Sequence, residues 1–298
     1  MVPRSFALIG PGRVGTALAY LLCTAGIRLT TVIGRTAESL ERARQLLPTQ
    51  DDPPGTVFAV QPGRELLDSD FVILALRDAQ IEDMVERLWQ SGLIRRGQVV
   101  IHLSGSLTAD TGRLPAGAGV GRLAMHPLQA VADPKSGIAH LPQAIWSLEG
   151  DSKGLSLGQE LAELLSLRWI RISAGQKPIY HAAACLASNY LVTLVHTATE
   201  MLQAVGFSAD LARDSLWPLV QGTVDNLKQS PPRDALTGPL ARGDVGTIRK
   251  HLEALAGRPE WVRLYRSLGL ATLPLAPGLS RDTLQELSEL LAEEDGDR

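Results

Sequence analysis

The sequence is poor in cysteine. Its 298 residues include two cysteines, Cys23 and Cys185, and both lie in apolar patterns of helical spacing. Two separated thiols make neither a disulfide framework nor a set of metal ligands, so we expect both to be free, buried and kept reduced in a cytoplasm. The sequence therefore predicts no metal site.

Long apolar runs and blocks of basic residues are also missing. No uninterrupted run approaches the roughly 20 apolar residues of a membrane-spanning helix, so we expect no membrane segment. The 29 lysines and arginines are scattered among 32 acidic residues, and the net charge is −3, which disfavours nucleic acid as a partner. The first apolar strand starts almost at once and leaves no space for a signal peptide. We expect a cytoplasmic protein whose partners are small molecules.

A glycine fingerprint stands close to the start of the chain. An apolar strand runs into Gly10-x-Gly12-x-x-Gly15, and an apolar helical pattern follows directly. This order of strand, tight turn and helix is typical of a dinucleotide-binding site. Gly10 permits the turn, Gly12 lets the backbone approach a pyrophosphate, and Gly15 allows the helix to pack closely. We expect this turn and the first helical residues, Arg13 and Val14, to bind a dinucleotide cofactor.

A carboxylate is absent where an NAD site usually has one. Such sites place Asp or Glu about 20 residues past the glycines, where it accepts hydrogen bonds from the adenosine ribose. Here the predicted strand at 29–33 is followed by Gly34, Arg35 and Thr36. Arg35 is suited to a bidentate contact with a 2′-phosphate, and Thr36 can cap the next helix. A solvated loop arginine would also account for Arg35, but not for the missing carboxylate, so the sequence favours NADP(H).

Strands and helices alternate through the first half of the chain. The alternation predicts an α/β fold, with an N-terminal Rossmann-type doubly wound sheet at residues 1–174 and an all-α domain at 175–298. Leu76 ends a central apolar strand and is expected beside the cofactor. Further strands are predicted at 57–60, 70–76, 98–103, 121–125, 144–148 and 169–172, loops at 48–55 and 133–142, and a solvated tail at 293–298.

Polar side chains follow the predicted fifth and sixth strands. The fifth strand delivers Ser104 and Ser106, and the sixth delivers His126, to the carboxyl edge of the sheet, where ligands of open α/β sheets bind. A histidine there can hydrogen-bond a carbonyl or a carboxylate. The serines fit a purely turn-shaping role equally well, and lone histidines are often structural.

A long helical pattern opens the second half, from Lys177 to about 205, and it is apolar on nearly every side. Such a helix is expected to be buried within a helical domain or across a subunit interface, which predicts a homodimer. Lys177, His181 and Ser188 share one side of it, with Asn189 at the edge of that stripe. This polar stripe either faces a wet cleft or bonds to a neighbouring helix.

Several motifs resemble those of known NADP-dependent enzymes. The glycine fingerprint, Gly34-Arg35-Thr36, the serine-bearing strand and the long helix resemble the superfamily of 6-phosphogluconate and 3-hydroxyisobutyrate dehydrogenases, with pyrroline-5-carboxylate reductase as a cousin. More narrowly, a bacterial family with a Rossmann-like domain joined to a domain of unknown function is similar at the motifs in 102–106, 126–129, 180–190 and 236–244. Some of that family are alternative ketopantoate reductases, so the resemblance implies NADP(H) and reduction of a small carboxylate. Prephenate dehydrogenases and deazaflavin-dependent NADP reductases are similar over the first domain.

The chain departs from this resemblance at one position. Hydroxyacid dehydrogenases of the superfamily have Asn four residues after the helix-opening Lys, whereas Lys177 is followed at that offset by His181. Hydride delivery to a carbonyl needs a proton donor nearby. We take His181 as donor and Lys177 as carboxylate ligand, or the reverse, with Ser104, His126 and Asn189 hydrogen-bonding the substrate. A non-catalytic NADP-binding sensor and a deazaflavin-dependent reductase stay open as alternatives.

Overall fold

A computed structural model describes residues 5–48, 55–112, 114–115, 117–276 and 278–292. The expected tail at 293–298 and most of the expected loop at 48–55 lie outside these residues. The chain divides into two compact units, residues 1–189 and residues 190–298, and each is described by itself. The predicted division between residues 174 and 175 stays a prediction; the structure adds one further helix to the first unit.

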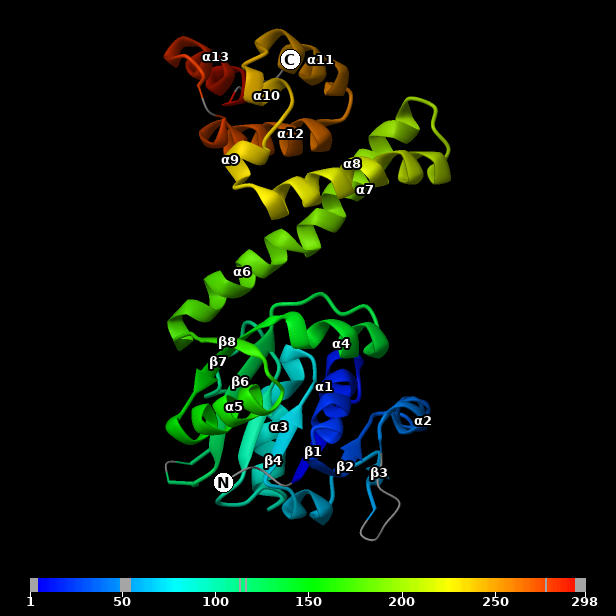
Figure 1. The fold of residues 1–298 in the computed structure, drawn as a ribbon, viewed down its shortest axis with the longest axis vertical. Coiled ribbons are helices and arrows are strands. Elements are labelled where there is room, and N and C mark those ends of the chain that lie inside the picture. Colours follow the sequence, from blue (N-terminus) through cyan, green and yellow to red (C-terminus); the bar gives the residue numbers. More distant parts are fainter. Residues whose placement is uncertain (1–4, 49–54, 113, 116, 277, 293–298) are drawn as a thin grey trace. The chain divides into compact units, whose positions relative to one another are not determined.

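The first unit is built on one eight-stranded sheet with the order β3-β2-β1-β4-β5-β6-β7-β8. Neighbouring strands are parallel, except that β6 and β7 are antiparallel. The first six positions repeat the strand order of dinucleotide-binding folds, and β3 and β8 form the two edges (Figure 1). The strands are β1 (Ser5–Ile9), β2 (Arg28–Ile33), β3 (Val57–Ala59), β4 (Phe71–Leu74), β5 (Val99–His102), β6 (Gly121–Pro127), β7 (Ile145–Gly150) and β8 (Arg168–Arg171).

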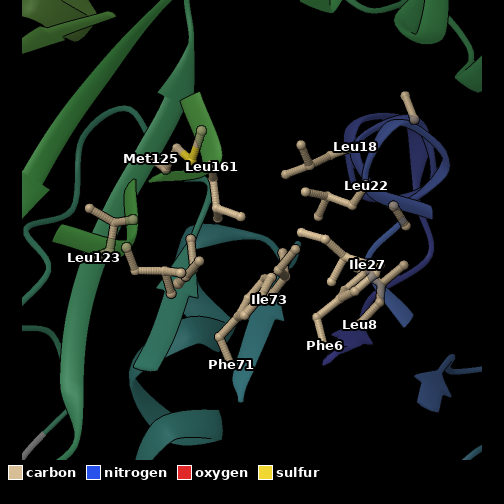
Figure 2. Packing of buried hydrophobic residues seen from close by; sticks show 14 of the residues in the cluster. Phe6, Leu8, Leu18, Leu22, Ile27, Phe71, Ile73, Leu123, Met125 and Leu161 are labelled. Carbon is tan, nitrogen blue, oxygen red and sulfur yellow. The ribbon is translucent and has the colours of Figure 1, made fainter. Parts of the chain in front are cut away.

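Alternate residues of the central strands face two separate cores, because successive side chains of a strand point to opposite faces. On one face Phe6 and Leu8 pack with Leu18 and Leu22 of the first helix, and Phe71 lies against Phe6 (Figure 2). Ala7 and Ile9 belong to the core on the other face. The uninterrupted apolar strands are therefore covered on both sides, which confirms the predicted doubly wound α/β fold.

Helices between the strands supply both covers. Residues of α1, α2, α4 and α5 join the first core, and residues of α3 join the second. The helical segments of this unit are α1 (Arg13–Thr24), α2 (Ala37–Leu46), η1 (Arg64–Asp68), α3 (Asp78–Gln90), α4 (Pro134–His140), η2 (Leu141–Gln143), α5 (Ser152–Leu164), η3 (Ala174–Gln176) and α6 (Lys177–Ala187).

The loop predicted at 133–142 is wrong, because α4 and η2 occupy it. Asp133 caps α4 by accepting from the backbone N–H groups of Lys135 and Ser136, and Pro134 stands in the first turn. An aspartate cap followed by proline is a recognisable helix start. The expectation of free thiols is confirmed for both cysteines, which are half-buried rather than fully buried, and burial raises the pKa of the Cys23 thiol to about 12.

The long helix predicted from 177 to 205 is interrupted. It divides at Ser188, where the backbone leaves helical geometry with φ −121° and ψ −70°, and α7 (Asn189–Ala204) follows. The remaining segments are α8 (Ala209–Gln229), α9 (Pro232–Ala235), α10 (Pro239–Arg242), α11 (Val245–Leu255), α12 (Pro259–Thr272), η4 (Leu273–Leu275) and α13 (Arg281–Ala292). Their core joins α11, α12, η4 and α13.

The long apolar segment was expected to be buried within the helical domain or across a subunit interface, and the structure contradicts only the first alternative. No residue of α7 is buried, and α8 buries only Ala212. The stretch 174–204 also passes the length and composition test for a membrane-spanning helix, with none of its apolar window buried. The stretch contains no uninterrupted apolar run of about 20 residues, as expected, and the expected absence of a membrane segment stays a prediction.

Candidate active site at the carboxyl edge of the sheet

The glycine turn has the backbone geometry expected of it. Gly10 has φ +93°, and a Cβ at this position would lie 2.4 Å from the Ala75 carbonyl oxygen. At Gly15 a Cβ would lie 2.5 Å from the Ala75 side chain, so strand and helix pack closely only through glycine. A Cβ at Gly12 would meet nothing within 4 Å. No side chain caps α1, which leaves the space beside Gly12 and the positive end of the helix available to an anion.

The two residues after β2 have different roles. Thr36 caps α2, its hydroxyl accepting from the Ser39 N–H at 3.2 Å, as expected. Arg35 is exposed and forms no ion pair with any described residue. Leu76 lies against the glycine turn, since its side chain would be 2.9 Å from a Cβ at Gly10. Arg35 is thus a cation without an ion-pair partner in the described part of the chain, at the edge where a 2′-phosphate would be expected.

A buried histidine shapes the loop after β5. His102 is 2% exposed, its Nδ1 accepts from the Ser104 N–H, and its Nε2 donates to the Thr108 carbonyl at 3.0 Å. Burial lowers the pKa of His102 to about 4, so the ring is neutral. The Ser104 hydroxyl accepts from the N–H groups of Ser106 and Leu107. The hydroxyl of Ser104 therefore shapes a turn, and the backbone carbonyl of Ser104 is left to accept a hydrogen bond from another segment.

Lys177 reaches that carbonyl from the first turn of α6. Its side chain is 0% exposed, and Nζ donates to the Ser104 carbonyl oxygen at 3.1 Å. Burial lowers the pKa of Lys177, while Glu149 and Asp78 oppose the shift without forming an ion pair with it. An ammonium group has three hydrogens to donate, so a buried lysine with one carbonyl partner retains capacity for a ligand.

Two more imidazoles lie next to this lysine in the fold. The rings of His126 and His181 meet edge to face with centroids 5.8 Å apart. Burial lowers the pKa of His126 to about 4, and the charges of His181 and Lys177 add to this effect. His181 Nδ1 is buried and has no hydrogen-bond partner among the described residues. Gly105 lies between the rings, because a Cβ there would be 2.4 Å from His181 Nδ1 and 3.0 Å from His126 Nε2.

The structure thus brings together Ser104, His126, Lys177 and His181, which the sequence selected from three separate segments. It does not bring Asn189 to them: that side chain is exposed and, within the described residues, makes no hydrogen bond to any of the four. The remaining predicted residues, Gly10, Gly12, Arg13, Val14 and Gly15, begin at the end of β1 on the same edge.

Sequence reasoning did not select four neighbours of this cluster, which are His102, Gly105, Asp78 and Tyr180. Tyr180 Oη lies 3.0 Å from His126 Nδ1, and Ser106 Oγ donates to Asp78 Oδ2 at 2.6 Å. Gly105 and His102 were read only as parts of a motif. Asp78 opens α3 directly after β4, so its place at the carboxyl edge was a usable signal. The role of Tyr180 depends on a contact 54 residues away in sequence and leaves no local signal.

A separate cavity of about 520 Å³ lies on the β7 and β8 side of the first unit. None of the predicted site residues lines it. Its walls are Glu149, Gly150, Arg171, Ile172, Ser173 and Ala174.

Family comparisons agree with this architecture. Residues 3–127 match the model of a Rossmann-like domain, and residues 144–272 match a domain of unknown function, DUF2520. The chain therefore joins a Rossmann-like domain to a DUF2520 domain. Comparison with curated protein sequences finds no match.

Solved structures with the same fold include oxidoreductases. A candidate NADP oxidoreductase from Bacteroides fragilis is 23% identical, with a TM-score of 0.67 over 91% of this chain and 98% of its own. A Thermotoga maritima protein is 22% identical, with a TM-score of 0.67 over 95% and 98%. The imine reductase of Myxococcus stipitatus, in complex with NADP⁺, is 18% identical, with a TM-score of 0.55 over 91% and 92%. At these identities the likeness concerns the fold.

Proposed function

We propose that this protein is an NADP(H)-dependent reductase of a carbonyl or imine group in a small carboxylate metabolite, with ketopantoate as the first candidate. The observation that carries the proposal is the buried Lys177 beside His126 and His181, on the sheet edge that also bears the glycine turn. A buried cation with spare hydrogens is costly unless a ligand or a reaction uses it.

The residues at the glycine turn and after β2 are suited to binding NADP(H). Gly12 leaves open space beside the uncapped N-terminus of α1, which suits a pyrophosphate. Arg35 would hold the 2′-phosphate, Thr36 keeps α2 in place, and Leu76 would pack against the cofactor. NADP is bound by the Myxococcus stipitatus imine reductase, which shares the fold. The sequence resemblance to alternative ketopantoate reductases supports the substrate class.

The spacing of the strands is compatible with a cofactor at the glycine turn and a substrate at the cluster of Lys177, His126 and His181. Adjacent strands lie about 4.8 Å apart, and β1 is separated from β5 by β4 alone. Two interstrand spacings correspond to about 10 Å between the glycine turn and the Ser104 turn along the edge, and His126 lies one strand further. A dinucleotide held at Gly12 can extend its reactive ring toward the lysine and imidazole cluster.

NADPH would supply the hydride, and the side chains would supply binding and the proton. Hydride addition to a carbonyl leaves negative charge on the carbonyl oxygen, and hydride addition to an imine requires a protonated imine nitrogen. In both cases a proton donor must lie next to that oxygen or nitrogen. His181 is the first candidate, because its Nδ1 is buried without a partner among the described residues. Lys177 would hold the carboxylate through its free hydrogens. The reverse assignment is also consistent with the lowered pKa of Lys177.

Two measurements test the proposal. Calorimetric titration should show tight NADPH binding and weaker NADH binding. A screen of 2-oxo acids, beginning with ketopantoate, and of cyclic imines should then reveal oxidation of NADPH. Tight binding without turnover of any compound would favour an NADP-binding sensor, and turnover of a deazaflavin alone would favour the deazaflavin reductase. Absence of NADPH binding would refute the proposal.

A further inference from the structure

Tyr180 forms a hydrogen bond with His126, the histidine of the candidate site that lies on β6. Its hydroxyl oxygen lies 3.0 Å from His126 Nδ1, and the two rings meet edge to face at 88° with centroids 5.6 Å apart. Tyr180 lies on α6 between Lys177 and His181. The helix turn that carries the two proposed reactive side chains therefore also carries the hydrogen-bond partner of His126. This contact ties β6 to α6 within the first unit.

The hydrogen bond has one favourable direction. Burial keeps His126 neutral at pH 7, with His181, Lys177 and Asp78 as the charged or titratable groups that act on it. Burial also raises the pKa of Tyr180, so the phenol retains its hydrogen. A phenol is a far stronger acid than a neutral imidazole N–H, and an imidazole nitrogen is a stronger base than a phenol oxygen. Tyr180 therefore donates to Nδ1, and the hydrogen of His126 stays on Nε2.

His126 Nε2 and His181 Nδ1 both lie beside Gly105. A Cβ placed at Gly105 would lie 3.0 Å from His126 Nε2 and 2.4 Å from His181 Nδ1. The two nitrogens thus lie close to the same backbone position, and they come from two different elements, β6 and α6. His181 Nδ1 has no hydrogen-bond partner among the described residues, so the backbone at Gly105 is flanked by the His126 nitrogen that carries the hydrogen and by an unused imidazole nitrogen.

We propose that Tyr180 is a positioning residue that locks His126 in the neutral Nε2–H tautomer, so that His126 gives a hydrogen bond, and not a proton, to an oxygen of the substrate. This inference rests on the proposed reductase function for the identity of the substrate oxygen. The tautomer itself is a property of the free protein. His126 then stabilises the developing charge, while the proton comes from His181 or Lys177.

Nitrogen NMR of the full chain with ¹⁵N-labelled histidine tests the tautomer directly. In the wild type, the His126 signals should show a hydrogen on Nε2 and none on Nδ1. Tyr180→Phe should convert this pattern to a mixture of tautomers. A hydrogen on Nδ1 in the wild type, or an unchanged pattern in Tyr180→Phe, would overturn the proposal. Neither NMR result depends on turnover, so the tautomer proposal and the reductase proposal can fail independently of each other.

The chain offers a matched control. Tyr265 Oη lies 2.8 Å from His251 Nδ1 in the helical unit, and these rings also meet edge to face, at 90°. Tyr265→Phe should alter the His251 signals and leave those of His126 unchanged. With NADPH and ketopantoate, Tyr265→Phe should keep full activity, whereas Tyr180→Phe should lower kcat about tenfold, the usual worth of one neutral hydrogen bond.

A double substitution separates positioning from simple support of the fold. The amide of His126→Gln can donate from the place of Nε2 but has no tautomers to select. Tyr180→Phe should therefore have little further effect on kcat in the His126→Gln background, since the pair acts as a unit. Equal losses of kcat in both backgrounds would assign Tyr180 a merely structural role and overturn the proposal.

Discussion

At the scale of single residues, position 105 requires glycine because neighbouring side chains leave no space for a Cβ, and not because of its backbone conformation. Its φ lies outside the left-handed region, so alanine is compatible with the main chain, yet a Cβ would collide with His181 Nδ1. Gly105→Ala should displace the two imidazoles and lower kcat by about 10²-fold, the effect of misplacing reacting groups by roughly 1 Å. NADPH affinity, measured by calorimetry, should stay unchanged.

Gly175→Ala is the matched control for this change. A Cβ at Gly175 would meet nothing within 4 Å, and its φ is also outside the left-handed region. This variant should keep wild-type turnover. Full activity in Gly105→Ala would show that the imidazoles over Gly105 take no part in the reaction.

We expect Arg35 to decide whether NADPH or NADH is the preferred cofactor. A charged bidentate contact is worth about 1.5 to 3 kcal/mol, so Arg35→Ala should weaken NADPH binding about tenfold or more and leave NADH binding almost unchanged. Arg42→Ala, which removes an exposed arginine paired with Glu38 on α2, is the control and should affect neither cofactor. Equal losses of affinity for NADPH and NADH in Arg35→Ala would contradict this assignment.

The two buried histidines make stability depend on pH. Folding lowers the pKa of His102 and of His126 from 6.5 to about 4. Between these values the unfolded chain binds protons that the folded chain does not, so stability is full above pH 6.5 and falls as the pH falls toward 4. Each imidazole should cost roughly 2 kcal/mol of the free energy of unfolding between pH 7 and pH 5.

Denaturant unfolding of the first unit at both pH values measures this effect. His126→Gln should lose roughly 2 kcal/mol less than the wild type over that interval, because one titrating group is gone. His140→Gln changes an exposed histidine and should keep the wild-type pH dependence. An identical pH dependence in His126→Gln would show that His126 is not held neutral by the fold.

At the scale of elements, the sequence was sufficient to predict those parts of the sheet that are determined by patterns of neighbouring residues. The glycine turn, the apolar strands and the order of strand and helix follow from patterns within about ten residues, and the structure reproduces them. The antiparallel pairing of β6 with β7 was not predicted, because a strand's partner depends on distant chain segments. The break at Ser188 was missed because neither glycine nor proline marks it.

The site shows the same division. Lys177 and His181 could be selected because a polar stripe on an apolar helix is visible in the sequence. Their link to Ser104 spans 73 residues and appears only in the fold. The same holds for Gly105, whose role comes from side chains of β6 and α6. Asn189 was selected from an uninterrupted helix, and the break at Ser188 removes the periodicity on which that choice depended.

The first turns of α6 should separate binding from chemistry. Lys177→Met keeps an apolar stem in the buried position but removes the ammonium, so it should mainly raise KM if Lys177 holds a carboxylate. His181→Asn should lower kcat about 10²-fold or more and leave NADPH affinity unchanged if His181 donates the proton. Steady-state kinetics of both variants with the substrate found in the screen would measure this. Full activity in His181→Asn would move the donor to Lys177 first and then to His126.

At the scale of the whole molecule, α7 and α8 carry large apolar side chains that are mostly exposed. Val192 is 70% exposed on α7, and Trp217 and Leu219 are 62% and 68% exposed on α8. The core of the helical unit joins α11, α12, η4 and α13 and leaves these side chains out. Soluble monomers rarely keep large apolar patches exposed, so we expect a second copy of the chain to cover these side chains.

Light scattering at micromolar concentration should therefore give twice the chain mass of 32.0 kDa. Burying one large apolar side chain contributes about 1.5 to 3 kcal/mol, so Leu219→Glu should weaken the dimer about tenfold or more, whereas Gln221→Glu on the same helix should change it little. A monomer in wild-type protein would refute the dimer. Because the stretch 174–204 also has the length and composition of a membrane span, flotation with lipid vesicles completes the test: a dimer that stays with the soluble fraction supports the subunit interface, and a chain that floats with the vesicles assigns the apolar segment to lipid.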